Sequence, residues 1–157
     1  MTRTPHLSLL AILVACLAPF ATAGDLVPFR STGVAQLLDQ PVPGGTVRAA
    51  DSGRATHLGN FTSVYNLQVS VVGASLVFDG TFTSTASNGD TITFDVYVAV
   101  SLFNGAFEGK FTAIGGTGRL RGISGGLVTT SGVADLSSGV FYYHCVGALP
   151  FGEASKS

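Results

Sequence analysis

The sequence predicts a single all-β domain, built as a sandwich or as one closed antiparallel barrel. Apolar and polar residues alternate with a period of two through most of the chain after residue 24. Glycine-rich turns separate these alternating segments. No apolar stripe with helical spacing occurs outside the N-terminal segment. A barrel is favoured because closure removes exposed strand edges and because glycines inside strands suit the bends of a barrel wall.

The clearest strand runs from Thr91 to Val100, where Ile, Phe and Val residues alternate with Thr, Asp and Tyr. The preceding segment, Leu76–Ala86, alternates in the same way. Between them stands Ser87-Asn88-Gly89-Asp90. Asn-Gly accepts positive φ at both central positions of a tight turn, so the two segments are predicted to pair as a β-hairpin.

Further strands are expected on both sides of this hairpin. Downstream, the alternation predicts strands at Ala106–Ile114, Arg119–Ile123, Gly126–Ser131 and Val140–Gly147. Upstream, it predicts strands at Phe29–Leu37, Thr46–Ala50 and Arg54–Val71. The last of these is long enough to require an internal bend or turn, which we expect near Gly59-Asn60.

The N-terminus, residues 1–23, has the features of a cleavable signal peptide. A short polar start containing Arg3 precedes an apolar core, Leu7–Leu17, which is shorter than the ~20 residues of a membrane-spanning helix. Pro19 ends that core, and Ala21-Thr22-Ala23 supplies small residues for a signal peptidase. We expect cleavage after Ala23, which leaves residues 24–157 as a secreted or periplasmic β-barrel domain without a transmembrane span.

A second interpretation of this segment places the protein on a membrane. Leu13-Val14-Ala15-Cys16 fits the bacterial lipobox, in which the cysteine becomes a lipidated N-terminus. The residues that follow, Leu17 to Ala23, are apolar, whereas the segment that tethers a lipoprotein is usually polar. Cleavage after Ala23 is therefore favoured, with a lipid anchor at Cys16 as the alternative.

The composition after residue 23 argues against several functions. Seven Lys and Arg stand against nine Asp and Glu, with no basic stripe to contact phosphates, so nucleic acid is not an expected partner. Cys145 is the one remaining cysteine, and a buried, inert thiol is its expected state. His57 and His144 lack neighbours at ligand spacing, so no metal site is predicted. No cofactor motif was found either.

Two segments carry a family resemblance. Gly115-Gly116-Thr117-Gly118-Arg119-Leu120-Arg121-Gly122-Ile123-Ser124-Gly125 resembles the Gly-Gly-Thr-Gly-x-Phe-x-x-Ala-x-Gly turn of plant dirigent proteins and the related turn of allene oxide cyclases. Gly53–Phe61 is similar to a stretch in bacterial exported proteins of the allene-oxide-cyclase-barrel-like type. The resemblance implies an eight-stranded antiparallel barrel with a central cavity.

The shared turn has a structural reason, because glycines permit the positive φ and the close approach that a tight turn needs. We assign that structural role to Gly115, Gly116, Gly118 and Gly122. The sequence departs from the family turn where Leu120 replaces Phe and Ile123 replaces Ala. The resemblance therefore implies a fold, and no catalytic residue is carried over from it.

Candidate functional residues depend on which strand face lines the interior. Asp95 is the first candidate for acid–base catalysis, since a barrel cavity would desolvate it if it pointed inwards. If the row of Ile, Phe and Val on its strand fills the barrel instead, Asp95 is a surface charge, and this outcome is favoured. Three tyrosines are candidates for holding an apolar ring: Tyr65, Tyr97 and Tyr142.

Three functions remain open from the sequence. The preferred one is an exported barrel without catalytic activity that binds a small apolar or aromatic molecule or acts as an interaction scaffold. The second is an isomerase or cyclase resembling allene oxide cyclase, with its chemistry in the barrel cavity. The third is a homo-oligomeric structural protein of the cell envelope.

Overall fold

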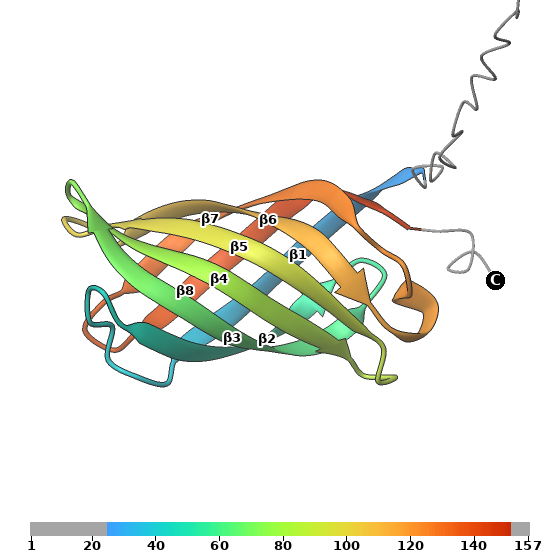
Figure 1. Ribbon diagram of the computed structural model, residues 1–157, viewed down its shortest axis with the longest axis horizontal. Helices are drawn as coiled ribbons and strands as arrows, with labels where there is room; N and C mark the ends of the chain where they lie inside the picture. Colours follow the sequence, from blue (N-terminus) through green and yellow to red (C-terminus); the bar gives the residue numbers. More distant parts are fainter. Residues whose placement is uncertain (1–24, 152–157) are drawn as a thin grey trace, which may run out of the picture.

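The computed structural model describes residues 25–151, which form one closed barrel of eight antiparallel strands (Figure 1). The all-β prediction and the barrel prediction are both confirmed. The strands follow one another around the barrel in chain order: β1 (Leu26–Leu37), β2 (Thr46–Ala55), β3 (Gly59–Val72), β4 (Ser75–Ala86), β5 (Thr91–Ser101), β6 (Ala106–Gly116), β7 (Gly125–Asp135) and β8 (Val140–Pro150). The expected signal peptide, with the alternative lipidation site Cys16, lies outside the described residues.

Closure of the barrel joins its first and last strands. Leu26 lies opposite Pro150 and Gln36 lies opposite Val140, so β1 and β8 pair along nearly their full length. Every strand therefore has two hydrogen-bonded neighbours, and the sheet has no free edge. Among the described residues, no helix is of a length and apolarity that would cross a membrane.

The predicted hairpin is present as β4 and β5, paired from Ser75–Ser101 to Thr85–Thr91. Its turn differs from the prediction, because Gly89 takes a positive φ of 89° and Asn88 does not. Asn88 instead accepts a hydrogen bond from the Asp90 backbone N–H through its side-chain oxygen, at 3.1 Å. The predicted break within 54–71 is also present, as the turn between the end of β2 at Ala55 and the start of β3 at Gly59.

The prediction of a strand at Arg119–Ile123 is wrong. Gly118 and Gly122 take positive φ angles of 61° and 81°, which interrupt an extended strand. Between them the chain forms a short 3₁₀ helix, η1 (Gly118–Leu120). The alternation of Arg with Leu and Ile that suggested a strand has another cause, since Leu120 and Ile123 are both buried.

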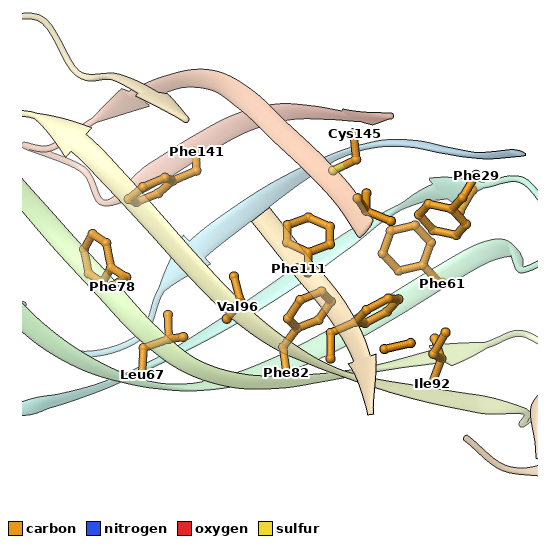
Figure 2. Packing of buried hydrophobic residues seen from close by; sticks show 14 of the residues in the cluster. Phe29, Phe61, Leu67, Phe78, Phe82, Ile92, Val96, Phe111, Phe141 and Cys145 are labelled. Carbon is orange, nitrogen blue, oxygen red and sulfur yellow. The ribbon is translucent and has the colours of Figure 1, made fainter. Parts of the chain in front are cut away.

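The rows of alternating apolar residues fill the barrel interior. Figure 2 shows phenylalanines from several strands converging inside, with Phe82 and Phe111 near the centre. The Phe82 ring stacks on Phe94 with 4.8 Å between centroids and meets Phe111 edge-on at 5.1 Å. These rings provide much of the buried apolar surface that stabilises so small a barrel.

One end of the barrel is closed by apolar side chains from two connecting segments and from the residue that follows the last strand. Leu58 comes from the β2–β3 turn, Leu120 and Ile123 come from the β6–β7 connection, and Phe151 follows β8. All four are buried, with exposures of 7% or less. Both ends of the described chain lie at this end of the barrel (Figure 1). A molecule bound inside would therefore occupy the middle of the barrel or its opposite half.

Candidate functional site

Buried polar side chains occupy one half of the barrel wall. The described residues that are both buried and polar face inwards from five strands: Ser31, Asp51, Ser63, Ser84 and Thr130. Of the three remaining strands, β5 and β6 contribute Phe94, Val96, Phe107 and Phe111 to the core, and β8 contributes Phe141, Cys145 and Leu149. We call the inner surface that carries the five polar residues the polar wall; phenylalanines from three of the same strands, β1, β3 and β4, are buried beside it.

Asp51 is the centre of the polar wall. Its side chain is 7% exposed, and its Oδ2 accepts two hydrogen bonds of 2.6 Å, one from the Tyr65 hydroxyl and one from the Tyr143 hydroxyl. The three residues come from β2, β3 and β8. Short hydrogen bonds to a carboxylate are among the strongest in proteins, so this group is held as one rigid unit.

A glycine makes room for this arrangement. Tyr143 lies opposite Gly33 of β1 in the strand register, and a Cβ at residue 33 would overlap the Tyr143 hydroxyl oxygen. The absence of a side chain there lets the tyrosine lean across β1 towards β2. Tyr65 is positioned differently, since its ring stacks on Phe82 of β4 with 4.6 Å between centroids.

Burial keeps both tyrosines protonated. Desolvation is the main cause that raises the pKa of each hydroxyl well above its ordinary value, and the negative charge of Asp51 raises it further. Each hydroxyl has one proton, and in both cases that proton points at Asp51 Oδ2. The tyrosines therefore act as fixed donors to the carboxylate.

The second carboxylate oxygen has no partner within the protein. Asp51 Oδ1 is fully buried and makes no hydrogen bond, and no other buried side-chain nitrogen or oxygen of residues 25–151 lacks a hydrogen-bond partner. Asp51 borders a cavity of about 20 Å³, together with Ser31, Ser84 and Cys145. A buried acceptor without a donor costs roughly 1–3 kcal/mol, so an unpaired Oδ1 indicates a site shaped by function more than by stability.

A larger cavity of about 70 Å³ lies beside the first. Tyr65, Tyr143 and Phe111 border both cavities and so form the partition between them. The other walls of the larger cavity are almost wholly apolar: Ala35, Leu37, Ala49, Leu67, Phe78, Val96, Val98, Phe107 and Phe141, with Thr130 as the one further polar residue. The arrangement offers an apolar chamber with a hydrogen-bonding group on one side.

Cys145 is buried next to the polar group, as expected. Its thiol donates to Thr130 Oγ1 at 3.4 Å, and burial is the main cause that raises its pKa. A raised pKa lowers the thiolate fraction, and the thiolate is the reactive form. The adjacent His144 is exposed on the outer face, so it does not activate the cysteine.

The structure separates the predicted site residues. Asp95 is exposed on the outside of β5, because the Ile, Phe and Val row of that strand fills the barrel. The interpretation of Asp95 as an inward-pointing acid is therefore wrong, and the favoured surface position is the observed one. Tyr97 and Tyr142 are 41% and 60% exposed on the outer wall, so they do not line the interior cavity. Tyr65 does line the cavity.

Sequence reasoning missed Asp51 and selected Tyr142 in place of its neighbour Tyr143, although a signal for each was present. Period two from the buried Val47 and Ala49 places Asp51 on the same inward face. Likewise, Tyr143 shares its face with Phe141 and Cys145, whereas Tyr142 falls on the other. The predicted strand Thr46–Ala50 stopped one residue before the aspartate.

The outer wall carries a wider groove of about 780 Å³ with a different chemistry. Basic side chains dominate its border: Arg30, Arg54, His57, Arg119 and His144. All five are exposed, and Arg119 is paired with Asp90 at 2.8 Å. Among residues 25–151, no three His, Cys, Asp or Glu side chains gather closely enough to hold a metal ion. The interior, with its buried and unpaired carboxylate, is the more specific candidate site.

Comparison with known proteins adds no assignment: no protein-family model matches the chain, and no curated protein matches it significantly.

Proposed function

We propose that the protein is an exported barrel that binds a small apolar or aromatic molecule in its interior. The observation that carries this proposal is the larger cavity, with apolar walls and two tyrosine hydroxyls anchored on a buried carboxylate. Binding sites for small molecules combine these two features, apolar lining and a few fixed polar groups. The resemblance of the 115–125 turn to dirigent proteins and allene oxide cyclases supports the same location.

The cavity volume limits the ligand. At about 70 Å³ it has roughly half the ~150 Å³ of an engineered apolar cavity that takes up benzene. It is also well below the ~300–1,000 Å³ of a typical drug-sized site. The ligand is therefore compact, or its binding moves aromatic side chains that line the cavity, such as Phe107 and Phe141.

Native mass spectrometry tests this proposal directly. Protein expressed with its full N-terminus and purified without organic solvent should carry an adduct of low mass. Ala49→Leu, which fills the cavity from β2, should abolish the adduct, because Ala49 lines the cavity wall. Val64→Leu is the matched control, since Val64 is 59% exposed on the outer face of β3. An adduct that persists in Ala49→Leu, or a bare wild-type chain, contradicts binding in this cavity.

An isomerase or cyclase is the second candidate, and one observation favours it. A buried carboxylate held by two tyrosines is a suitable general base, since its free oxygen Oδ1 is the atom that would accept a proton. In this alternative, Asp51 replaces Asp95 as the acid–base residue. Asp51→Asn should then remove turnover of an identified substrate while leaving its binding measurable. Unchanged turnover would exclude the assignment.

A further inference from the structure

The hydroxyl groups that line the larger cavity have already used their protons. Tyr65 and Tyr143 donate theirs to Asp51 Oδ2. Thr130 donates to the His144 carbonyl oxygen at 3.4 Å and accepts from the Cys145 thiol. A hydroxyl has one donor and two acceptor lone pairs. What these three groups still offer to a bound molecule is therefore acceptor capacity alone.

This restricts the chemistry of the ligand. A ketone, ether or other molecule that only accepts hydrogen bonds finds no donor in the larger cavity, and its own polar atom is left unpaired at a cost. A molecule with N–H or O–H groups can donate to the tyrosine oxygens. The polar side of the cavity thus selects for donors.

The charge in the interior favours a cation over a neutral donor. Among the Asp, Glu, His, Lys and Arg side chains of residues 25–151, Asp51 alone is buried, so no buried Lys or Arg accompanies it. A buried carboxylate without a cation leaves room for a positive charge from outside the protein. Phenylalanine rings also line the cavity, among them Phe78, Phe107 and Phe141, and the face of such a ring attracts cations.

We propose that the barrel takes up a primary amine, bound as its ammonium ion on a compact apolar body. The N–H groups of an ammonium ion suit the acceptors on the polar side of the cavity, the hydroxyl oxygens of Tyr65, Tyr143 and Thr130, and the charge of Asp51 lies directly behind the two tyrosines. The apolar body of the amine occupies the space among the aliphatic and aromatic side chains that line the cavity. This inference rests on the proposed function, since it specifies the ligand of the same cavity.

Three probes with the same number of non-hydrogen atoms test the proposal: isobutylamine, isobutanol and butanone. Each is titrated at pH 7 into ¹⁵N-labelled protein, and the amide signals of Asp51, Tyr65 and Val98 are followed. The amine is expected to bind about tenfold or more tightly than the alcohol, because it adds charged hydrogen bonds, and the ketone is expected to bind weakest. Alcohol or ketone binding as tightly as the amine would overturn the proposal.

Two variants locate the effect. Asp51→Asn should weaken amine binding about tenfold or more and leave alcohol binding nearly unchanged. Asp79→Asn is the matched control, because Asp79 is an exposed carboxylate on the outer face of β4. If Asp51→Asn fails to fold, Tyr143→Phe replaces it, since it removes one acceptor and keeps the carboxylate. Amine binding that is unaffected by the interior variant, or equally reduced by Asp79→Asn, would refute the assignment.

The failure of this inference is distinguishable from failure of the proposed function. Tight binding of isobutanol without preference for the amine leaves the apolar binding site intact and removes only the ammonium assignment. If no probe shifts the cavity signals, the ammonium assignment is refuted, and the adduct measured by native mass spectrometry decides the proposed function separately.

Discussion

Replacing Tyr143 by Phe is the most direct test of the group around Asp51. The substitution removes a single oxygen atom and one 2.6 Å hydrogen bond to the carboxylate, and it leaves the ring in place. A hydrogen bond to a charged group contributes about 1.5–3 kcal/mol. We therefore expect Tyr143→Phe to lower the free energy of unfolding by about 2 kcal/mol.

The neighbouring tyrosine supplies a control that matches in chemistry and differs in position. Tyr142 is 60% exposed on the same strand, so Tyr142→Phe should change stability by less than about 0.5 kcal/mol. Tyr65→Phe should resemble Tyr143→Phe, because it donates to the same oxygen. The double variant Tyr65→Phe/Tyr143→Phe should cost more than the sum of the two, since it leaves a buried carboxylate without any donor.

Urea unfolding followed by circular dichroism measures these differences at pH 7. The linear slopes should agree among the variants, so that shifts of the midpoint report stability alone. The reasoning is refuted if Tyr143→Phe is as stable as Tyr142→Phe. It is also refuted if the double variant is more stable than either single one, because the tyrosines would then cost more than they contribute.

Three further predictions test other parts of the molecule. Gly33→Ala should lower the free energy of unfolding in urea by about 1–3 kcal/mol, because the new Cβ overlaps the Tyr143 hydroxyl. Gly115→Ala is the control, and it should leave the free energy of unfolding nearly unchanged because the space around residue 115 is open. The Cys16→Ser substitution leaves Cys145 as the one cysteine of the chain. Because Cys145 is buried, it should react with a thiol reagent at pH 8 far more slowly in native buffer than in guanidinium. Equal reaction rates in the two solvents would contradict its burial. Hydrogen bonds from Ser137 and Ser138 lower the pKa of Asp135 to about 2, below the value of ~3.9 in the unfolded chain. The small stabilisation by the ionised Asp135 should therefore be present above about pH 4 and be lost as the pH falls towards 2. A pKa of Asp135 near 4, measured by carboxyl NMR, would contradict this prediction.

Alternation predicted the strands well because each of them buries one face and exposes the other. Leu76–Ala86 and Thr91–Val100 coincide with β4 and β5 to within one residue at each end. The segment Arg119–Ile123 shows the limit of that signal. The buried Leu120 and Ile123, which close the end of the barrel, give the sequence the same apolar–polar alternation as a strand. The positive φ angles of Gly118 and Gly122 distinguish this turn from a strand, but they are visible only in the structure.

The site was less predictable, because its residues break the rule that predicted the fold. A strand face rich in apolar residues identifies the interior, but the inward face of β2 carries small side chains and one charge. Asp51 has the local pattern of a surface residue and lies in the core. Its tyrosine partners are 14 and 92 residues away in sequence, and only closure of the barrel brings all three together.

The pairing of β1 with β8 also has a consequence for how the chain reaches its native state. The other seven strand pairs are hairpins between consecutive strands, which form with little loss of chain entropy. The β1–β8 pair joins residues more than 100 positions apart, so it requires nearly the whole chain to be ordered first. During synthesis from the N-terminus, β1 emerges first and its partner emerges last. Until then both strands present open edges, and this interval is when the protein is most exposed to pairing with a second, unfinished copy of itself.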